Sequence, residues 1–273
     1  MSYVLRWQEA MVDHTGNMPK RMIDDGAEEA FWKTHLQKRK QTEPDPYAHD
    51  VYRGIAKLVH KEDTVLEIGP GWGNYTFSLA RDVEHVTCVD SAEAIIQSLE
   101  KRAEQEGYYN MSFLHKKWEE ATLVPQHDVV FGFNCYYRMF QITEALLKMN
   151  RTAKRLAIVG MNTGPEKPHY MELHRRGFTI SLRKRDYIDL LNILFELGIR
   201  ANCTLIPLQS TKLYGSFDEA LNDNVTKIVS LDHTKLDEVA DVLRSHLVEE
   251  NGGYRYTYHF HAALLHWTPV KGI

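Results

Sequence analysis

The sequence is poor in cysteine and has no surplus of basic residues. Its 273 residues include three cysteines, Cys88, Cys135 and Cys203, which lie far apart in apolar surroundings. We therefore expect reduced, buried thiols rather than a disulfide framework or a zinc site. Lys and Arg number 33 against 37 Asp and Glu, a formal net charge of −4. That balance argues against the basic surface with which proteins usually bind nucleic acid, although a local basic patch is compatible with it.

Long hydrophobic runs are also absent. No apolar stretch approaches the roughly 18 residues that a membrane-spanning helix needs. The first residues, Met1–Arg6, lack the apolar core of a secretion signal. We expect no membrane partner and a soluble, cytoplasmic protein. A chain of this length buries a full core as one elaborated domain, or as one domain with a small cap.

The chain does contain a short apolar strand that runs into a glycine-rich loop. Val65, Leu66 and Ile68 predict the strand, and residues 69–73 read Gly-Pro-Gly-Trp-Gly. A helix is expected to begin with Asn74 and the run 75–80. This order is typical of α/β sheets that bind nucleotide-like ligands, because glycine lets the backbone approach the ligand closely. The alternative is an ordinary strand–helix–strand unit with a tight turn.

Spacing and charge indicate which ligand fits this loop. The dinucleotide fingerprint reads G-x-G-x-x-G, whereas this loop reads G-x-G-x-G and Glu67 precedes it in the strand. An acid there would repel a pyrophosphate but suits an ammonium group, such as the one on the amino-acid end of S-adenosylmethionine. A second strand, His85–Asp90, ends in an acid 19 residues after Gly71. A carboxylate at that strand end accepts both hydroxyls of a ribose.

At three places the sequence resembles the class I S-adenosylmethionine-dependent methyltransferases: residues 65–73, 86–90 and 127–134. The resemblance extends over about residues 30–160. It implies an α/β fold, a Rossmann-like sheet of seven strands with helices on both faces and the last strand antiparallel. It also implies methyl transfer, with S-adenosylmethionine as cofactor and S-adenosylhomocysteine as product.

The remaining chain fits this fold. Further strands are expected at 111–115, 128–133, 155–160, 201–208 and 254–267, and helices at 47–60, 95–103, 141–150, 186–198 and 236–247. We predict a helical N-terminal lid over residues 1–46, then a methyltransferase domain over 47–273. An insertion is expected around 162–185, where five basic residues lie between Arg175 and Arg185.

The resemblance assigns the cofactor site residue by residue. Glycines of the loop are expected at the methionyl end, acids at the ammonium and the ribose, and residues after the third strand beside adenine. Ten residues are expected to bind the cofactor: Glu67, Gly69, Pro70, Gly71, Gly73, Asp90, Ser91, Trp118, Glu119 and Asn134. For Trp118 the alternative is a core aromatic, and Asn134 is expected at the methyl-transfer centre.

The acceptor is expected beside Tyr47, Tyr136, Tyr137 and Arg138. Tyrosine offers an apolar face and a hydroxyl, and Arg138 suits either an acceptor carboxylate or a surface salt bridge. Residues 134–137 read Asn-Cys-Tyr-Tyr and lack the N-P-P-Y arrangement of enzymes that methylate nucleobase amines. The sequence does not identify a catalytic residue, because methyl transfer depends mainly on positioning and needs a general base only if the acceptor holds its proton at neutral pH.

Three functions follow from these patterns. We predict methyl transfer to a small-molecule acceptor, with no nucleic-acid partner. The alternatives are an RNA or protein methyltransferase that uses the basic segment 175–185, and a non-catalytic S-adenosylmethionine-binding module. His259 and His261 share one face of a strand, but no carboxylate at ligand spacing accompanies them, so no metal site is expected.

Overall fold

The computed structural model describes residues 2–12, 16–38, 44–122, 124–182 and 184–273. The chain divides into two compact units. Unit 1 comprises Met1–Asn162, Arg185–Ile206 and Ala262–Ile273, and unit 2 comprises Thr163–Lys184 and Pro207–His261. The segment predicted as an insertion around 162–185 thus lies almost wholly in unit 2, together with residues 207–261.

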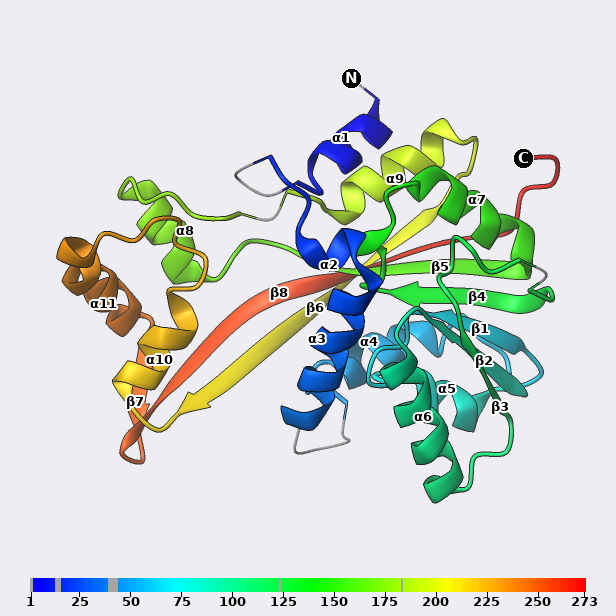
Figure 1. Cartoon of the computed structure of the whole chain (residues 1–273), viewed down its shortest axis with the longest axis horizontal. Coiled ribbons are helices and arrows are strands. Elements are labelled where there is room, and N and C mark those ends of the chain that lie inside the picture. The colour runs from blue at the N-terminus through cyan, green and yellow to red at the C-terminus, as the bar shows by residue number, and fades with distance from the viewer. Residues whose placement is uncertain (1, 13–15, 39–43, 123, 183) are drawn as a thin grey trace. The chain divides into compact units, whose positions relative to one another are not determined.

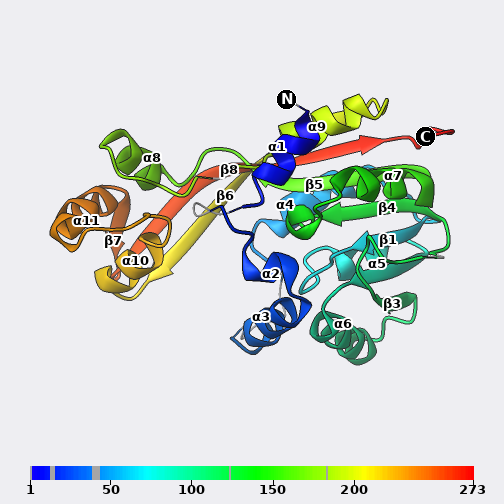
Figure 2. The same cartoon turned by 45° about the horizontal axis from the view of Figure 1, so that its top comes forward.

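A single eight-stranded sheet runs through the fold (Figure 1). Its strands follow the order β3-β2-β1-β4-β5-β8-β6, and β7 pairs with β8. The last strand runs opposite to β6, as predicted (Figure 2). The strands are β1 (Thr64–Ile68), β2 (His85–Asp90), β3 (Met111–His115), β4 (His127–Phe133), β5 (Ala153–Thr163), β6 (Asn202–Tyr214), β7 (Leu247–Glu250) and β8 (Gly253–Trp267).

The eighth strand is β7, which the sequence analysis did not predict. It pairs antiparallel with the start of β8, with Glu250 opposite Gly253. The two residues between them, Asn251 and Gly252, have φ angles of 52° and 77°. Two consecutive left-handed residues form the tight hairpin turn that matches strand twist, and Asn-Gly is its preferred sequence.

Strands β1 to β5 pair in parallel and place the glycine-rich loop at the point where strand order reverses. Leu66 of β1 lies opposite Thr87 of β2 on one side and Val130 of β4 on the other. Loops from the carboxyl ends of adjacent strands diverge at such a point and leave a crevice between them. The fold therefore places a candidate site above Ile68, between β1 and β4.

Helices cover both faces of the sheet in unit 1, as predicted. α7 and α9, with α1, lie on one face, and α4, α5 and α6 lie on the other (Figures 1 and 2). An apolar cluster joins the sheet to the first group through Leu66, Val130, Leu146 and Ile193. The helices of unit 1 are α1 (Tyr3–Glu9), α2 (Lys20–Ile23), α3 (Asp25–Lys38), α4 (Ala48–Ile55), α5 (Thr76–Asp82), α6 (Glu93–Glu106), α7 (Ile142–Thr152) and α9 (Tyr187–Glu196).

Helix α1 is anchored to the body of unit 1. Trp7 is fully buried, and its indole N–H donates to the backbone oxygen of Met139 at 3.2 Å. The guanidinium of Arg185 lies 5.1 Å from the centre of the Trp7 ring. Arg6 pairs with Asp189, in the first turn of α9, at 3.0 Å. The side chain of Asp186 caps the N-terminus of α9. This first helix is therefore part of the core.

Unit 2 has its own small core. α8 (Pro168–Arg175) and α11 (Leu236–Ser245) pack through Tyr170, Leu173, Val239 and Val242. α10 (Phe217–Asn224) completes the unit, and its Asn224 backbone oxygen lies 3.1 Å from the buried imidazole of His169. No helix among the described residues of either unit has the length and apolar character to span a membrane.

Candidate functional site

A cavity of about 420 Å³ lies in unit 1 at the carboxyl edge of the sheet. It is lined by the ends of β1, β2 and β4, by the loop after β3, and by α2 and α3. Twelve of the predicted site residues line it together: Tyr47, Glu67, Gly69, Pro70, Gly71, Asp90, Ser91, Trp118, Glu119, Asn134, Tyr137 and Arg138. Gly73 and Tyr136 are not among its lining residues.

The glycine-rich loop forms one wall of the cavity, and two of its glycines are needed for that backbone path. Gly69 has φ 62°, and a Cβ added to it would lie 2.4 Å from the Cβ of Cys135. Only glycine therefore lets the ends of β1 and β4 come this close. At Gly71, which has φ 55°, a Cβ would be in van der Waals contact with the Trp32 ring, at 3.6 Å, so the conformation of the backbone rather than crowding favours glycine here. Gly73 instead packs against Leu99 and Phe77 and fits the α5–α6 side of the fold.

Glu67 is a buried carboxyl with an unsatisfied oxygen. It is 2% exposed, and its Oε2 has no hydrogen-bond partner within the part of the chain that the structure describes. Burial raises the pKa of this carboxyl to about 7. An unpaired buried acceptor costs free energy, so this position is suited to a ligand that brings a positively charged donor.

Asp90 lies beside it at the end of β2 and is 8% exposed. Its Oδ1 accepts a hydrogen bond from the backbone N–H of Ala92 at 2.9 Å. Burial raises the pKa of Asp90 to about 6. Two carboxyls in one cavity with raised pKa values are typical of a functional site. Here they favour ligands with ammonium or hydroxyl donors.

Trp118 and Glu119 form the part of the wall that follows β3. Trp118 is 3% exposed and belongs to the apolar cluster that contains Leu66 and Val130. Its indole N–H donates to the backbone oxygen of Ala145 at 3.1 Å, and the ammonium of Lys148 lies 4.3 Å from the ring centre. The indole is thus held rigidly while it borders the cavity. Its predicted contact with adenine stays a prediction.

Some residues of the loop after β4 are buried in the core, and others line the cavity. Asn134 has φ 53°, and its side-chain oxygen accepts a hydrogen bond from the backbone N–H of Asn162 at 2.8 Å. Tyr136 is 1% exposed, and its hydroxyl donates to the backbone oxygen of Gly132 at 2.9 Å, so the structure places this predicted acceptor residue in the core. Tyr137 and Arg138, in the same single turn of 3₁₀ helix, line the cavity.

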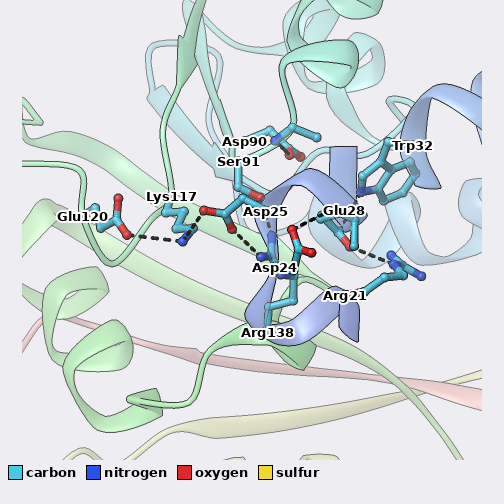
Figure 3. A network of polar contacts seen from close by, with 12 residues as sticks. Arg21, Asp24, Asp25, Glu28, Trp32, Asp90, Ser91, Lys117, Glu120 and Arg138 are labelled. Carbon is cyan, nitrogen blue, oxygen red and sulfur yellow. Dashed lines mark hydrogen bonds and ion pairs between the residues drawn. The ribbon is translucent and has the colours of Figure 1, made fainter. Parts of the chain in front are cut away.

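Helix α3 covers this wall through a third buried carboxyl group, that of Glu28 (Figure 3). Glu28 accepts hydrogen bonds from Arg21 and from the Trp32 indole, both at 2.8 Å, and from the Tyr137 hydroxyl at 2.5 Å. Burial alone would raise the pKa of Glu28, but these three donors lower it below its ordinary value. The carboxylate is therefore ionised and joins α2, α3 and the loop after β4.

Asp25 makes a second connection from α3 (Figure 3). It accepts from Lys117 at 2.7 Å and from Arg138 at 2.6 Å, and the hydrogen bond from Lys117 is the main reason that the pKa of Asp25 is lowered. Arg138 also donates to Ser91 at 3.2 Å. Lys117 and Arg138 are thus both held by α3, and α3 is bonded to the loops after β3 and β4.

A network of hydrogen bonds around Asn74 lies at the end of the cavity beside the glycine loop. The Asn74 side chain accepts from the backbone of Asp45 at 2.8 Å and from the Trp72 indole at 2.9 Å, and donates to the Asp45 carboxylate at 2.9 Å. The Tyr47 hydroxyl donates to the same carboxylate at 3.2 Å. The linker before α4 is therefore fixed against the loop.

Sequence reasoning missed several lining residues, including Glu28, Trp32, Asp45, Asn74 and Tyr75. Asn74 and Tyr75 follow the glycine loop directly, so their position in sequence already pointed to the site. The residues of α3 gave no comparable indication. Among the described residues, no group of three or more His, Cys, Asp or Glu side chains is placed to hold a metal ion.

Comparison with known proteins gives three informative matches. Residues 65–155 match a family described as a methyltransferase domain. The chain is 26% identical over 182 residues to an uncharacterized protein of Haemophilus influenzae, covering 64% of this chain and 65% of that protein. It is 33% identical over 72 residues to a mitochondrial ribosomal RNA small subunit methyltransferase of Arabidopsis thaliana, covering 26% and 19%. The chain thus spans less than two thirds of either relative.

Among solved structures, a candidate methyltransferase from Bacillus halodurans superposes with a TM-score of 0.54 at 17% identity. The match covers 80% of this chain and 97% of that one. At this identity the likeness shows a common fold.

Proposed function

We propose that the protein transfers a methyl group from S-adenosylmethionine to a small-molecule acceptor. Residues 65–155 match a methyltransferase-domain family, and the fold is shared with a solved methyltransferase-like structure. The observation that carries this proposal is the cavity that Glu67, Asp90 and Gly71 line together.

The residues present fit this cofactor. The buried, unsatisfied Oε2 of Glu67 suits the ammonium of the methionyl end, and Asp90 suits the two ribose hydroxyls. Gly71 lines the same cavity. Glu67 does not suit a dinucleotide, because this buried carboxyl precedes the glycine loop, where it would face the pyrophosphate.

When bound, S-adenosylmethionine supplies a methyl group already activated by a positively charged sulfonium. The protein then has to orient the acceptor and exclude water. We propose that α2 and α3, within the predicted lid over residues 1–46, do the latter. Met22, Glu28 and Trp32 line the cavity, and Asp25 and Glu28 bond to loops of the sheet.

The lining favours an acceptor that is small and either neutral or positively charged. A cavity of about 420 Å³ has to hold cofactor and acceptor together. Six acidic side chains line it against three basic ones, Lys116, Lys117 and Arg138. Two of those three pair with Asp25. The negative charge of the lining would therefore repel carboxylate or phosphate acceptors and attract a protonated amine.

An RNA acceptor is the second candidate, because the 72-residue match is to a ribosomal RNA methyltransferase. The basic segment 175–185 gives this candidate little support. Arg176 of unit 2 pairs with Glu172 at 2.6 Å, and Arg185 of unit 1 packs over Trp7. Arg183 lies outside the described residues. We therefore rank RNA below a small molecule.

Calorimetry followed by a transfer assay tests the proposal. We expect S-adenosylmethionine and S-adenosylhomocysteine to bind and NAD to show no binding. Methyl transfer from labelled cofactor should then appear with a pool of small amines or neutral metabolites, and not with ribosomal RNA. Tight NAD binding without any S-adenosyl ligand would overturn the cofactor. Binding without transfer to any pool would favour the non-catalytic module.

A further inference from the structure

Tyr75 carries a buried hydroxyl that the proposed chemistry has not yet used. The residue is 3% exposed and lines the cavity. Its hydroxyl has no hydrogen-bond partner among the residues that the structure describes. Folding alone therefore leaves a polar group unsatisfied beside a ligand site, at a cost in stability. A ligand atom that accepts this hydrogen bond would remove the cost.

The position of the ring is fixed by aromatic neighbours. Tyr75 lies edge-on to Phe131 and Phe133, with ring centres 5.7 and 4.9 Å away. Both phenylalanines belong to β4, so the ring is held by the sheet rather than by a mobile loop. A hydroxyl on a rigid ring is preorganised for one direction of hydrogen bonding.

The Tyr75 hydroxyl is protonated and can donate a hydrogen bond. Burial raises the pKa of Tyr75 well above its ordinary value, and nearby Tyr47, Asp45 and Glu67 raise it further. The phenol therefore keeps its proton near neutral pH, and Glu67 is close enough to influence it. One cavity thus holds an unsatisfied carboxyl oxygen on Glu67 and an unsatisfied donor on Tyr75.

This pair complements a zwitterionic amino-acid group, in which ammonium and carboxylate are attached to one carbon. We propose that the Tyr75 hydroxyl donates a hydrogen bond to the α-carboxylate of S-adenosylmethionine, beside the ammonium that Glu67 binds. The inference rests on the proposed cofactor. Tyr75 is then a positioning residue that makes the site selective for the intact amino-acid end.

The test compares two ligands and three proteins by calorimetry. The ligands are S-adenosylhomocysteine and its decarboxylated analogue, in which hydrogen replaces the α-carboxylate. The proteins are wild type, Tyr75→Phe and Tyr52→Phe. The control Tyr52 hydroxyl donates to Ser78 and Asp82 and does not line the cavity. Tyr75→Phe should weaken S-adenosylhomocysteine about tenfold or more, as for a hydrogen bond to a charged acceptor.

The same substitution should change the affinity for the decarboxylated analogue less than twofold. The thermal midpoint of free Tyr75→Phe should be unchanged or higher, because the variant loses an unsatisfied buried hydroxyl, and a structural defect would lower it. Equal losses for both ligands, or no loss for S-adenosylhomocysteine, would overturn the inference. Failure of wild type to bind S-adenosylhomocysteine would instead overturn the proposed function, before any variant is compared.

Discussion

Glu67→Gln should stabilise the free protein, and the gain should depend on pH. The pKa of Glu67 is raised from its ordinary 4.5 to about 7 because the carboxyl is buried. Below pH 4.5 the group is protonated in both the folded and the unfolded chain, so it costs nothing. As pH rises, the unfolded chain ionises first, and the folded state loses stability until the pH passes 7.

The size of this loss follows from the shift. Each pKa unit corresponds to 1.36 kcal/mol, so a shift of this size destabilises the folded state at pH 8 by about 3 kcal/mol. Glutamine resembles the protonated carboxyl in shape and does not ionise. The variant should therefore match wild type near pH 4.5 and exceed it by about 3 kcal/mol at pH 8, or roughly 6 °C in thermal midpoint.

Urea and thermal unfolding of ligand-free protein at half-unit steps from pH 4.5 to 8 would measure this. Glu104→Gln, at an exposed position of α6, is the matched control and should show no such trend. Protein purified without bound cofactor is essential, because an ammonium beside Glu67 would favour the ionised form. A difference between variant and wild type that stays constant across this pH range would refute the reasoning.

Three further predictions concern the ligand and the cover. Binding of S-adenosylhomocysteine should release protons and weaken as pH falls from 7 to 5, because Glu67 and Asp90 hold protons in the ligand-free protein. Calorimetry in two buffers of different ionisation enthalpy measures the proton release, and proton uptake would contradict the prediction. Asp90→Ala should weaken the same ligand about tenfold or more, since it loses charge-assisted hydrogen bonds; an unchanged dissociation constant in a folded variant would remove Asp90 from the site. Asp25→Asn should speed protease cleavage of α3 and lower methyl transfer a few-fold, because the variant loses ion pairs to Lys117 and Arg138, and exposed ion pairs each contribute up to about 1 kcal/mol. Asp218→Asn, at an exposed position of unit 2, is the control. Equal rates for both variants would argue against α3 as a lid over the cavity.

The sheet and the glycine loop could be predicted because short stretches of sequence determine their structure. Alternating strands and helices set the order of elements, and the loop at 69–73 requires glycine for close backbone approach. The resemblance to class I methyltransferases is confirmed in fold and over residues 65–155. The dipeptide Asn251-Gly252 also favours a hairpin turn, which the structure contains.

The lid over residues 1–46 stays a prediction, and the contacts of α3 beside the cavity could not be predicted, because a helix pattern does not state what the helix packs against. Glu28 reads as a surface acid in sequence, yet it is 2% exposed because Arg21, Trp32 and Tyr137 converge on it. Tyr136 and Tyr137 are adjacent and chemically identical, and only the turn of 3₁₀ helix sends one to the core and the other to the cavity. Trp7 in the core also means that deleting residues 1–43 would damage the fold, so point variants of α3 are sharper probes.

The distribution of tryptophan gives the molecule a built-in optical reporter. Three of its five tryptophans, Trp32, Trp72 and Trp118, line the cavity. Trp32 and Trp72 have ring centres 5.7 Å apart, and His35 stacks on Trp72 at 5.1 Å. Indole emission responds to local polarity and to neighbouring rings, so a ligand entering the cavity should change the intensity and wavelength of intrinsic fluorescence. Trp7 and Trp267, buried in the core, would supply a constant background, and occupancy could be followed in real time without a label.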